Sequence, residues 1–222
     1  MTRSVIFAMR QLDRWRAILI VAAGLGVGSS TLAQAVLNSC GDLKNGYGPF
    51  DYRKDKDKLP IVENSHFTPP VEALIHGVSG PIGAELDYAL RAFPNHHRVL
   101  AAMSRYGQKL KSPQPPGANY TIDCYFDRAI RFAADDNVVR MLFAQYLGRL
   151  GRTKEAIGQL EVASAQAKDD GFTHYNIGLV YFELGQPDRA LAQAHRAMAL
   201  GFERPELRQM LERAAKWRDP VN

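Results

Sequence analysis

Apolar residues recur with a helical period through the second half of the chain. Between positions 140 and 200 they return every three or four residues in four consecutive segments, which short polar turns separate. The segments cover residues 140–150, 153–167, 173–184 and 188–200. Such spacing places the apolar side chains of each segment on one face of an α-helix. The pattern predicts an all-α fold in which successive helices pack face to face.

The same residue types also return at a fixed interval of 34 positions. Gly151 precedes Gly185 by this interval, and Ala156 precedes Ala190 by the same interval. A fixed interval of this length is typical of a protein built from stacked two-helix units. The sequence therefore predicts repeats at residues 97–136, 137–170 and 171–204, followed by a capping helix at 205–217.

The first repeat is longer than the other two, and the region before it is less regular. The first repeat exceeds the interval, and the proline-rich stretch 112–117 accounts for the excess as a loop. Residues 86–93 read as the closing helix of a degenerate earlier repeat. The helical region is thus expected to begin near residue 82.

One repeat carries a motif of a known family. The residues concerned are His-Tyr-Asn-Ile-Gly-Leu-Val-Tyr at 174–181, followed by Gly185, Ala190, Ala197 and Leu200. They resemble the tetratricopeptide repeat, which has a large residue, Leu-Gly and Tyr on its first helix and small residues on its second. His174 stands where the family usually has Trp, and Phe202 where it usually has Pro. The resemblance implies a short α-solenoid of about three helix-turn-helix repeats over residues 82–217.

Small residues have a physical role in this motif. Gly178 would let paired helices approach closely, and Gly185 would permit a tight turn between them. Ala190 and Ala197 would each face a neighbouring helix at short range.

The N-terminus has the pattern of a secretory signal. A basic segment, residues 1–16, precedes an apolar run at 17–28 and a small-x-small triplet at 33–35. We expect cleavage after Ala35 and a periplasmic mature protein. Two alternatives stay open: an uncleaved anchor in the inner membrane, since no charge falls between positions 17 and 41, and a lipoprotein modified at Cys40.

Between the leader and the helices lies a segment rich in turn formers. Residues 36–81 contain Asn-Gly, Gly-Pro and Pro-Pro pairs around a charged stretch at 53–58, and only 71–76 reads as briefly helical. This pattern predicts a loop-rich, extended N-terminal arm that could pack over the repeats.

The two cysteines, Cys40 and Cys124, are far apart in the sequence. In an exported protein such a pair is usually a disulfide, which would tie the arm to the repeats. Two separate buried thiols are the alternative.

Composition adds little that is specific. Apolar residues make up 46% of the chain and charged residues 23%, an ordinary globular balance. The net charge is +5, but residues 1–35 hold four Arg and one Asp, so the remainder carries only +2. No basic stripe with interleaved aromatic residues accompanies it, so we expect no nucleic-acid partner.

The sequence contains no recognised catalytic motif. There is no G-x-S-x-G, no phosphate-binding loop and no H-E-x-x-H. The pair His96-His97 is read as structural, and Asp135-Asp136 and Asp169-Asp170, one repeat interval apart, as helix caps. We therefore expect no enzymatic activity, cofactor or metal site. A metal-binding or enzymatic accessory role, using His66, His76 and Cys40, is the remaining alternative.

The family resemblance also implies a binding surface. In tetratricopeptide arrays the first helix of each repeat lines a groove. The positions carried over are Arg98, Ala101, Ala102, Arg105 and Lys109 from the first repeat, Met141, Leu142, Gln145 and Arg149 from the second, and Phe172, Tyr175, Asn176, Leu179 and Phe182 from the third. The family's complete carboxylate-binding set is absent. The resemblance implies a non-enzymatic scaffold that holds a protein or peptide, with a membrane-anchored assembly or secretion factor as the alternative.

Overall fold

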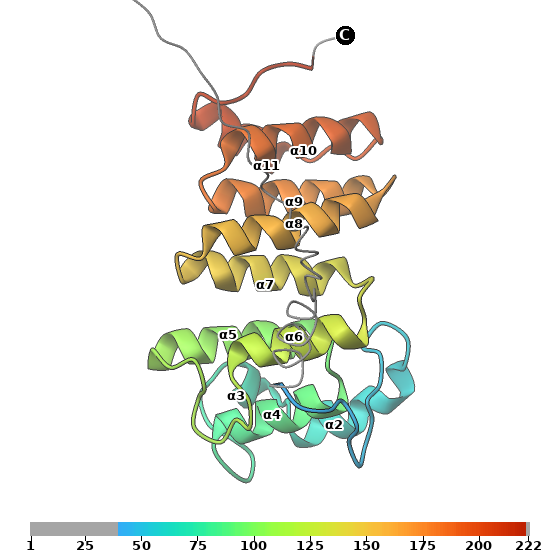
Figure 1. Cartoon of the computed structure of the whole chain (residues 1–222), viewed down its shortest axis with the longest axis vertical. Coiled ribbons are helices and arrows are strands. Elements are labelled where there is room, and N and C mark those ends of the chain that lie inside the picture. The colour runs from blue at the N-terminus through green and yellow to red at the C-terminus, as the bar shows by residue number, and fades with distance from the viewer. Residues whose placement is uncertain (1–39, 221–222) are drawn as a thin grey trace, which may run out of the picture.

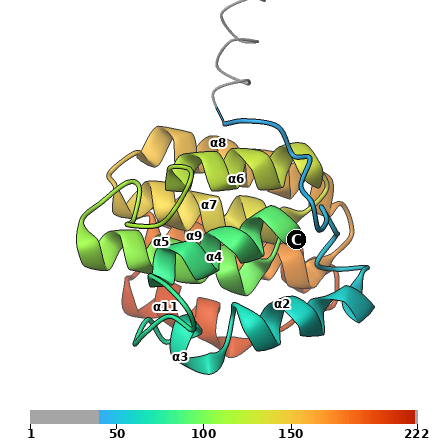
Figure 2. The same ribbon diagram turned by 90° about the horizontal axis from the view of Figure 1, so that it is seen from below.

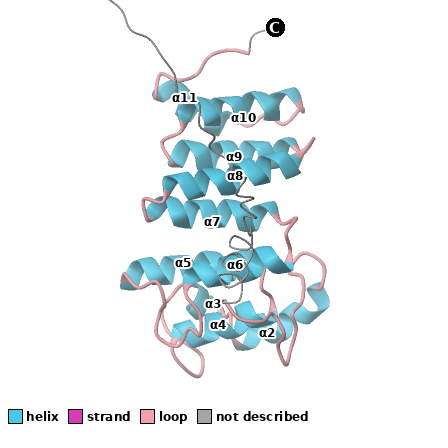
Figure 3. Cartoon of the chain, in the orientation of Figure 1, coloured by secondary structure: helices cyan, strands magenta, loops and turns pink. Residues whose placement is uncertain are grey.

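The structure, a computed structural model, describes residues 40–220, and in that range it consists of helices and loops without strands (Figure 3). The all-α prediction is confirmed. The expected leader and its cleavage position after Ala35 lie outside the described residues. In the N-terminal part the helices are η1 (Lys56–Lys58), α2 (Leu59–Ser65), α3 (Pro69–Glu72), α4 (Ile82–Ala92), α5 (His97–Leu110) and α6 (Ile122–Phe132). In the C-terminal part they are α7 (Asn137–Arg149), α8 (Thr153–Ala167), α9 (Gly171–Glu183), α10 (Pro187–Ala199) and α11 (Pro205–Arg213).

The helices from α4 to α11 stack along the long axis of the molecule (Figure 1). Helix α7 pairs with α8, and α9 pairs with α10, while α8 contacts α9 between the two pairs. Helix α7 also contacts α5 on one side and α9 on the other, and α9 contacts α11. Helices α5, α7 and α9 therefore follow one another as neighbours along the stack.

Local sequence signals explain where these three helices begin. Each follows a residue whose side chain accepts a hydrogen bond from a backbone N–H of the first turn: His96 for α5, Asp136 for α7 and Asp170 for α9. The predicted capping role of Asp136 and Asp170 is confirmed. Gly151 and Gly185 follow α7 and α9 with positive φ values of 75° and 69°, a conformation that favours glycine and turns the chain into the next helix.

Small residues lie where helices approach most closely. Ala190 and Ala197 are 0% and 1% exposed. A Cβ atom added at Gly178 would lie 3.4 Å from the carbonyl oxygen of Ala190 and only 2.6 Å from Cδ2 of Leu207. The closest constraint on Gly178 therefore comes from the terminal helix α11 rather than from α10, its partner in the hairpin.

The N-terminal segment is more helical than its sequence suggested. Where an extended arm was expected, η1, α2 and α3 wrap around one end of the stack (Figure 2); α2 contacts α4, and α3 contacts α4 and α5. Val62 and Val71 are fully buried and belong to the same core as the later helices. Pro60 lies in the first turn of α2, where the missing N–H costs no hydrogen bond.

A disulfide attaches the beginning of the described chain to α6. The sulfur atoms of Cys40 and Cys124 are 2.08 Å apart, and 84 positions separate the two residues. The guanidinium of Arg128, which is 1% exposed, donates hydrogen bonds to the carbonyl oxygens of Cys40 (3.0 Å) and Asp42 (2.6 Å). No helix within residues 40–220 has the length and apolar character needed to cross a membrane.

Candidate functional site

A hollow of about 290 Å³ lies between α7 and α9. Its lining residues are Val138, Met141, Leu142, Gln145, Phe172, Asn176, Leu179, Val180 and Glu183. Most of these side chains are apolar, and the polar ones are amides and one carboxylate. Six of the predicted positions thus come together here: Met141, Leu142, Gln145, Phe172, Asn176 and Leu179.

A second hollow, of about 190 Å³, adjoins the first between α5 and α7. It is lined by Ala101, Ser104, Arg105, Leu142, Gln145 and Arg149. Because Leu142 and Gln145 line both hollows, the two form one continuous depression across three helices. We call it the α5–α7–α9 groove.

Two residues on the groove expose an unusual amount of apolar surface. Phe172 is 59% exposed and Val138 is 37% exposed. Both occupy the second position of their helix, and one repeat interval separates them. Val138 was not among the predicted groove positions, although the repeat interval identifies it as the equivalent of Phe172. Apolar surface that gathers in a depression is a common mark of an interaction site.

Some polar side chains of the groove already form hydrogen bonds within the protein, and others do not. Gln145 donates a hydrogen bond to Glu183 (2.9 Å), and Asn176 donates to the carbonyl oxygen of Phe172 (2.8 Å). Arg149 is exposed, and within residues 40–220 its guanidinium makes no hydrogen bond or ion pair. It is therefore the cation best placed to bind an anionic or carbonyl group of a ligand.

At α5 the N-terminal segment occupies part of the surface that the repeats alone would leave open. Arg105 donates a hydrogen bond to the carbonyl oxygen of Glu72 (3.1 Å), and Lys109 donates to that of Leu74 (3.1 Å). Arg98 forms an ion pair with the Glu72 carboxylate, and this hydrogen bond lowers the pKa of Glu72. Arg105 thus lines the groove while bound to the last residue of α3.

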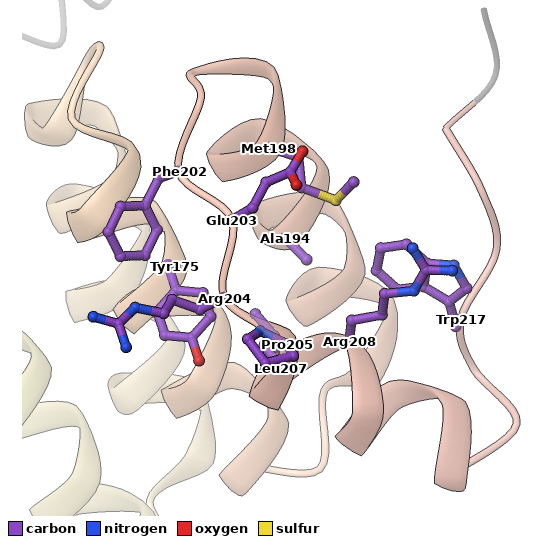
Figure 4. Close-up of a pocket in the computed structure, with 10 residues that line it drawn as sticks. All are labelled: Tyr175, Ala194, Met198, Phe202, Glu203, Arg204, Pro205, Leu207, Arg208 and Trp217. Atoms are coloured by element: carbon purple, nitrogen blue, oxygen red, sulfur yellow. The ribbon is translucent and has the colours of Figure 1, made fainter.

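Two predicted positions lie apart from the groove. Tyr175 is 9% exposed and lines a different pocket of about 340 Å³ beneath the segment that connects α10 to α11 (Figure 4). Its hydroxyl donates to Glu206 (3.0 Å); burial, and then this hydrogen bond, raise the pKa of Tyr175. Phe182 is partly buried and packs against the core. Helix α11 therefore removes Tyr175 from the surface that periodicity assigned to it.

The histidines considered as site residues make structural contacts. Nδ1 of His66 lies 2.7 Å from a carboxylate oxygen of Glu85, and Nε2 of His97 lies 2.9 Å from Asp136. Nδ1 of His76 lies 2.9 Å from the carbonyl oxygen of Gly77. In the part of the chain that the structure describes, no group of three or more His, Cys, Asp or Glu side chains comes together as a metal site would require.

Comparison of the chain with protein-family models, with curated proteins and with solved structures finds no match. The chemistry of the groove therefore has to be inferred from the residues that line it.

Proposed function

We propose that this chain is an exported, non-enzymatic scaffold of the tetratricopeptide-repeat kind, which holds a segment of another protein in the α5–α7–α9 groove. The observation that carries the proposal is the groove itself, where Phe172 and Val138 expose apolar surface near the start of α9 and α7 and the unpaired Arg149 lies at the other end of α7. Three successive helices contribute to it, as they would in a solenoid that lays an elongated ligand across its repeats.

The lining suggests how a ligand would be held. Apolar side chains of the ligand would pack on Leu142, Leu179 and the Phe172 ring, because these surfaces together form the floor of the larger hollow. A backbone carbonyl or carboxylate of the ligand would accept hydrogen bonds from Arg149. Shape and apolar contact would dominate binding, and Arg149 would set the orientation.

Export is supported by two independent features of the chain. The leader pattern at residues 1–35 is that of a signal peptide, and the disulfide between Cys40 and Cys124 is typical of an oxidising compartment such as the periplasm. Mass spectrometry of the protein from cells tests the leader. A mature chain that starts at Val36 supports a periplasmic scaffold, whereas a chain with an intact N-terminus supports a membrane-anchored form.

Site-specific photo-crosslinking tests the groove. Phe172 is replaced by a benzophenone amino acid, and the matched control carries it at Val162, which is 40% exposed on α8. We expect discrete adducts in envelope fractions from position 172 only. Arg149→Glu should reduce their yield, whereas Lys154→Glu, the same charge change on α8, should not. Absence of adducts at 172, or the same adducts at 162, contradicts the proposal.

A further inference from the structure

A larger cavity, of about 490 Å³, lies where the inserted loop of the first repeat meets α5, α6 and α7. Gly107 and Ile122 form part of its wall together with Pro113 of the loop, and Tyr146 and Leu150 from the end of α7 form another part. Ile122 is 1% exposed and Tyr146 is 6% exposed, so this part of the wall is well packed, whereas Leu150 is 54% exposed and leaves apolar surface open to solvent. Its size and mainly apolar lining are those of a small-molecule site, for which volumes of about 300–1,000 Å³ are usual.

The charges around this cavity do not cancel. Asp123 is the single carboxylate among the described residues that line it, and it is paired with Arg152 and accepts a hydrogen bond from the Tyr146 hydroxyl (3.0 Å). Lys111 and Arg149 also line the cavity. Within residues 40–220 neither of these two side chains makes an ion pair or a hydrogen bond. Arg152 is bound to Glu155 (2.7 Å) as well as to Asp123, so the three cations and these two carboxylates leave a net charge of +1 beside an apolar interior.

Lys111 occupies a backbone position that disfavours its own residue type. It ends α5 in the left-handed conformation, with φ 51° and ψ 39°. Glycine is the residue usually found at such a helix end, because a Cβ atom is strained there. A lysine is therefore less stable than a glycine at this position. Its side chain places an unpaired ammonium group at the cavity.

From these observations we infer that the cavity binds a small amphipathic monocarboxylate, such as a free medium-chain aliphatic acid. The aliphatic chain would pack against Ile122, Leu150 and the Tyr146 ring. The carboxylate would bind Lys111 and Arg149 at the edge of the apolar wall. The cavity shares Ser104 and Arg149 with the α5–α7–α9 groove but would bind a different class of ligand, and Lys111, which lines the cavity and not the groove, separates the two proposals experimentally.

Titration calorimetry with decanoate, at concentrations where it is monomeric, tests the inference. Decanol has the same chain without the charge, and decylammonium carries the opposite charge. We expect saturable 1:1 binding of decanoate, binding of decanol about tenfold weaker, and no binding of decylammonium. Equal affinity for decanol and decanoate, or no binding of decanoate, overturns the inference.

Substitutions at the two cations locate the site. Lys111→Gly and Arg149→Gln should each weaken decanoate binding about fivefold, the effect of losing one exposed charge-assisted contact. Lys111→Gly should also leave the melting temperature unchanged or raise it, which separates a binding role from a structural one. The matched control is Lys168→Gly, because Lys168 also has a positive φ (50°) but lies at the end of α8, away from the cavity. Decanoate affinity that is insensitive to Lys111→Gly contradicts the assignment.

One further variant tests whether decanoate binds in this cavity, and one further ligand tests whether a peptide is the better occupant. Gln108, an exposed lining residue, is replaced by Trp to fill the opening, and this change should abolish decanoate binding while the circular dichroism spectrum stays the same. Ala-Ala-Leu tests a peptide C-terminus as the source of the carboxylate. If this peptide binds more tightly than decanoate in a manner that depends on Lys111, the free acid is the wrong ligand class.

Discussion

Gly178 on α9 lies close to α10 and α11, and the space beside its Cα atom holds a hydrogen atom but not a methyl group. A Cβ atom there would meet Leu207 and Gln193 at 2.6 and 3.3 Å, so Gly178→Ala requires α11 or its side chains to move. We expect a loss of about 1–3 kcal/mol in the free energy of unfolding, measured by urea denaturation. Gly158→Ala is the matched control, because no atom of the described residues lies within 4 Å of its added Cβ and alanine favours the helix by about 0.5–1 kcal/mol. Destabilisation of the same size in both variants would contradict this account.

His96 is completely buried, and its two hydrogen-bond contacts favour the neutral imidazole. Its Nδ1 accepts a hydrogen bond from the Val99 N–H at the start of α5, and its Nε2 lies 3.1 Å from a carboxylate oxygen of Glu63. The neutral tautomer with the proton on Nε2 satisfies both contacts. A second proton would point from Nδ1 at the Val99 N–H. Burial and then the positive charge of Arg98 lower the pKa of His96 to about 3, and they outweigh the Glu63 carboxylate, which favours protonation.

The depressed pKa of His96 makes stability depend on pH. An unfolded chain protonates this histidine near pH 6.5, so between about pH 6.5 and pH 3 the unfolded state binds more protons than the folded state. The contribution of His96 is complete above pH 6.5 and is lost as pH falls, by about 2 kcal/mol at pH 5. His96→Asn keeps a capping residue but does not titrate. Urea midpoints measured from pH 4.5 to pH 7.5 should depend less on pH in this variant, and an unchanged slope would assign the effect to other groups.

Among the elements, α11 packs on both α9 and α10 and buries Leu207 and Leu211. Leu207 is 1% exposed, and it is the side chain nearest to an added Cβ at Gly178 on α9. Leu207→Ala should cost about 2–4 kcal/mol, because it leaves a cavity beneath a terminal helix. It should also make room for the extra methyl group of Gly178→Ala. The double variant should therefore be clearly more stable than the sum of the two losses predicts, and additive losses would show that the two residues do not share this space.

The helices could be predicted where the repeat interval and the apolar period agreed. The segment 153–167 matches α8 residue for residue, and 97–136 contains α5 and α6 on either side of the expected loop. Helix α2 could not be predicted, because its seven residues are too few to show two helical periods. Its stability comes from burying Leu59 and Val62 against the stack, which is a tertiary effect.

The residues of the candidate site could be predicted where they occupy equivalent positions of successive repeats. Met141, Gln145, Asn176 and Leu179 come together because equivalent positions of stacked helices face the same side. Tyr175 is an equivalent position too, but the path of the chain into α11 covers it, and that path is not encoded in the periodicity. The cavity beside Lys111 was not predicted for a related reason, since its shape depends on how the inserted loop folds.

On the scale of the whole molecule, the N-terminal segment holds one end of the stack together. Beyond the disulfide, Asp51 accepts a hydrogen bond from Asn95 (2.8 Å), and Asn95 also donates to Asp136 at the start of α7 (3.0 Å). Arg53 forms ion pairs with Asp51 (2.8 Å) and Asp135 (3.0 Å). The segment thus contacts residues just before α5 and just before α7, the first helices of the first two predicted repeats, and these contacts help to fix the relative position of the two helices.

The disulfide should contribute a large part of the stability of this arrangement. It joins two cysteines whose sequence separation is 84, and the loop-entropy relation gives about 4 kcal/mol for a closure of that size. We expect dithiothreitol to lower the free energy of unfolding by about this amount in urea denaturation. The Cys40→Ser/Cys124→Ser variant should match the reduced protein and should not respond to the reductant.

Limited proteolysis separates two ways in which the bond could act. If the disulfide acts mainly by restricting the unfolded chain, the hydrogen bonds of Arg128 to Cys40 and Asp42 keep the segment in place after reduction. Cleavage between residues 40 and 55 then stays slow in native buffer. If the bond is needed to hold the segment on α6, that region becomes the first site of cleavage while the α7–α10 repeats remain intact. Because the buried guanidinium of Arg128 donates hydrogen bonds to two carbonyl oxygens of the segment, we expect the first outcome. Early cleavage in the reduced protein would show that these hydrogen bonds are too weak to hold the segment without the covalent link.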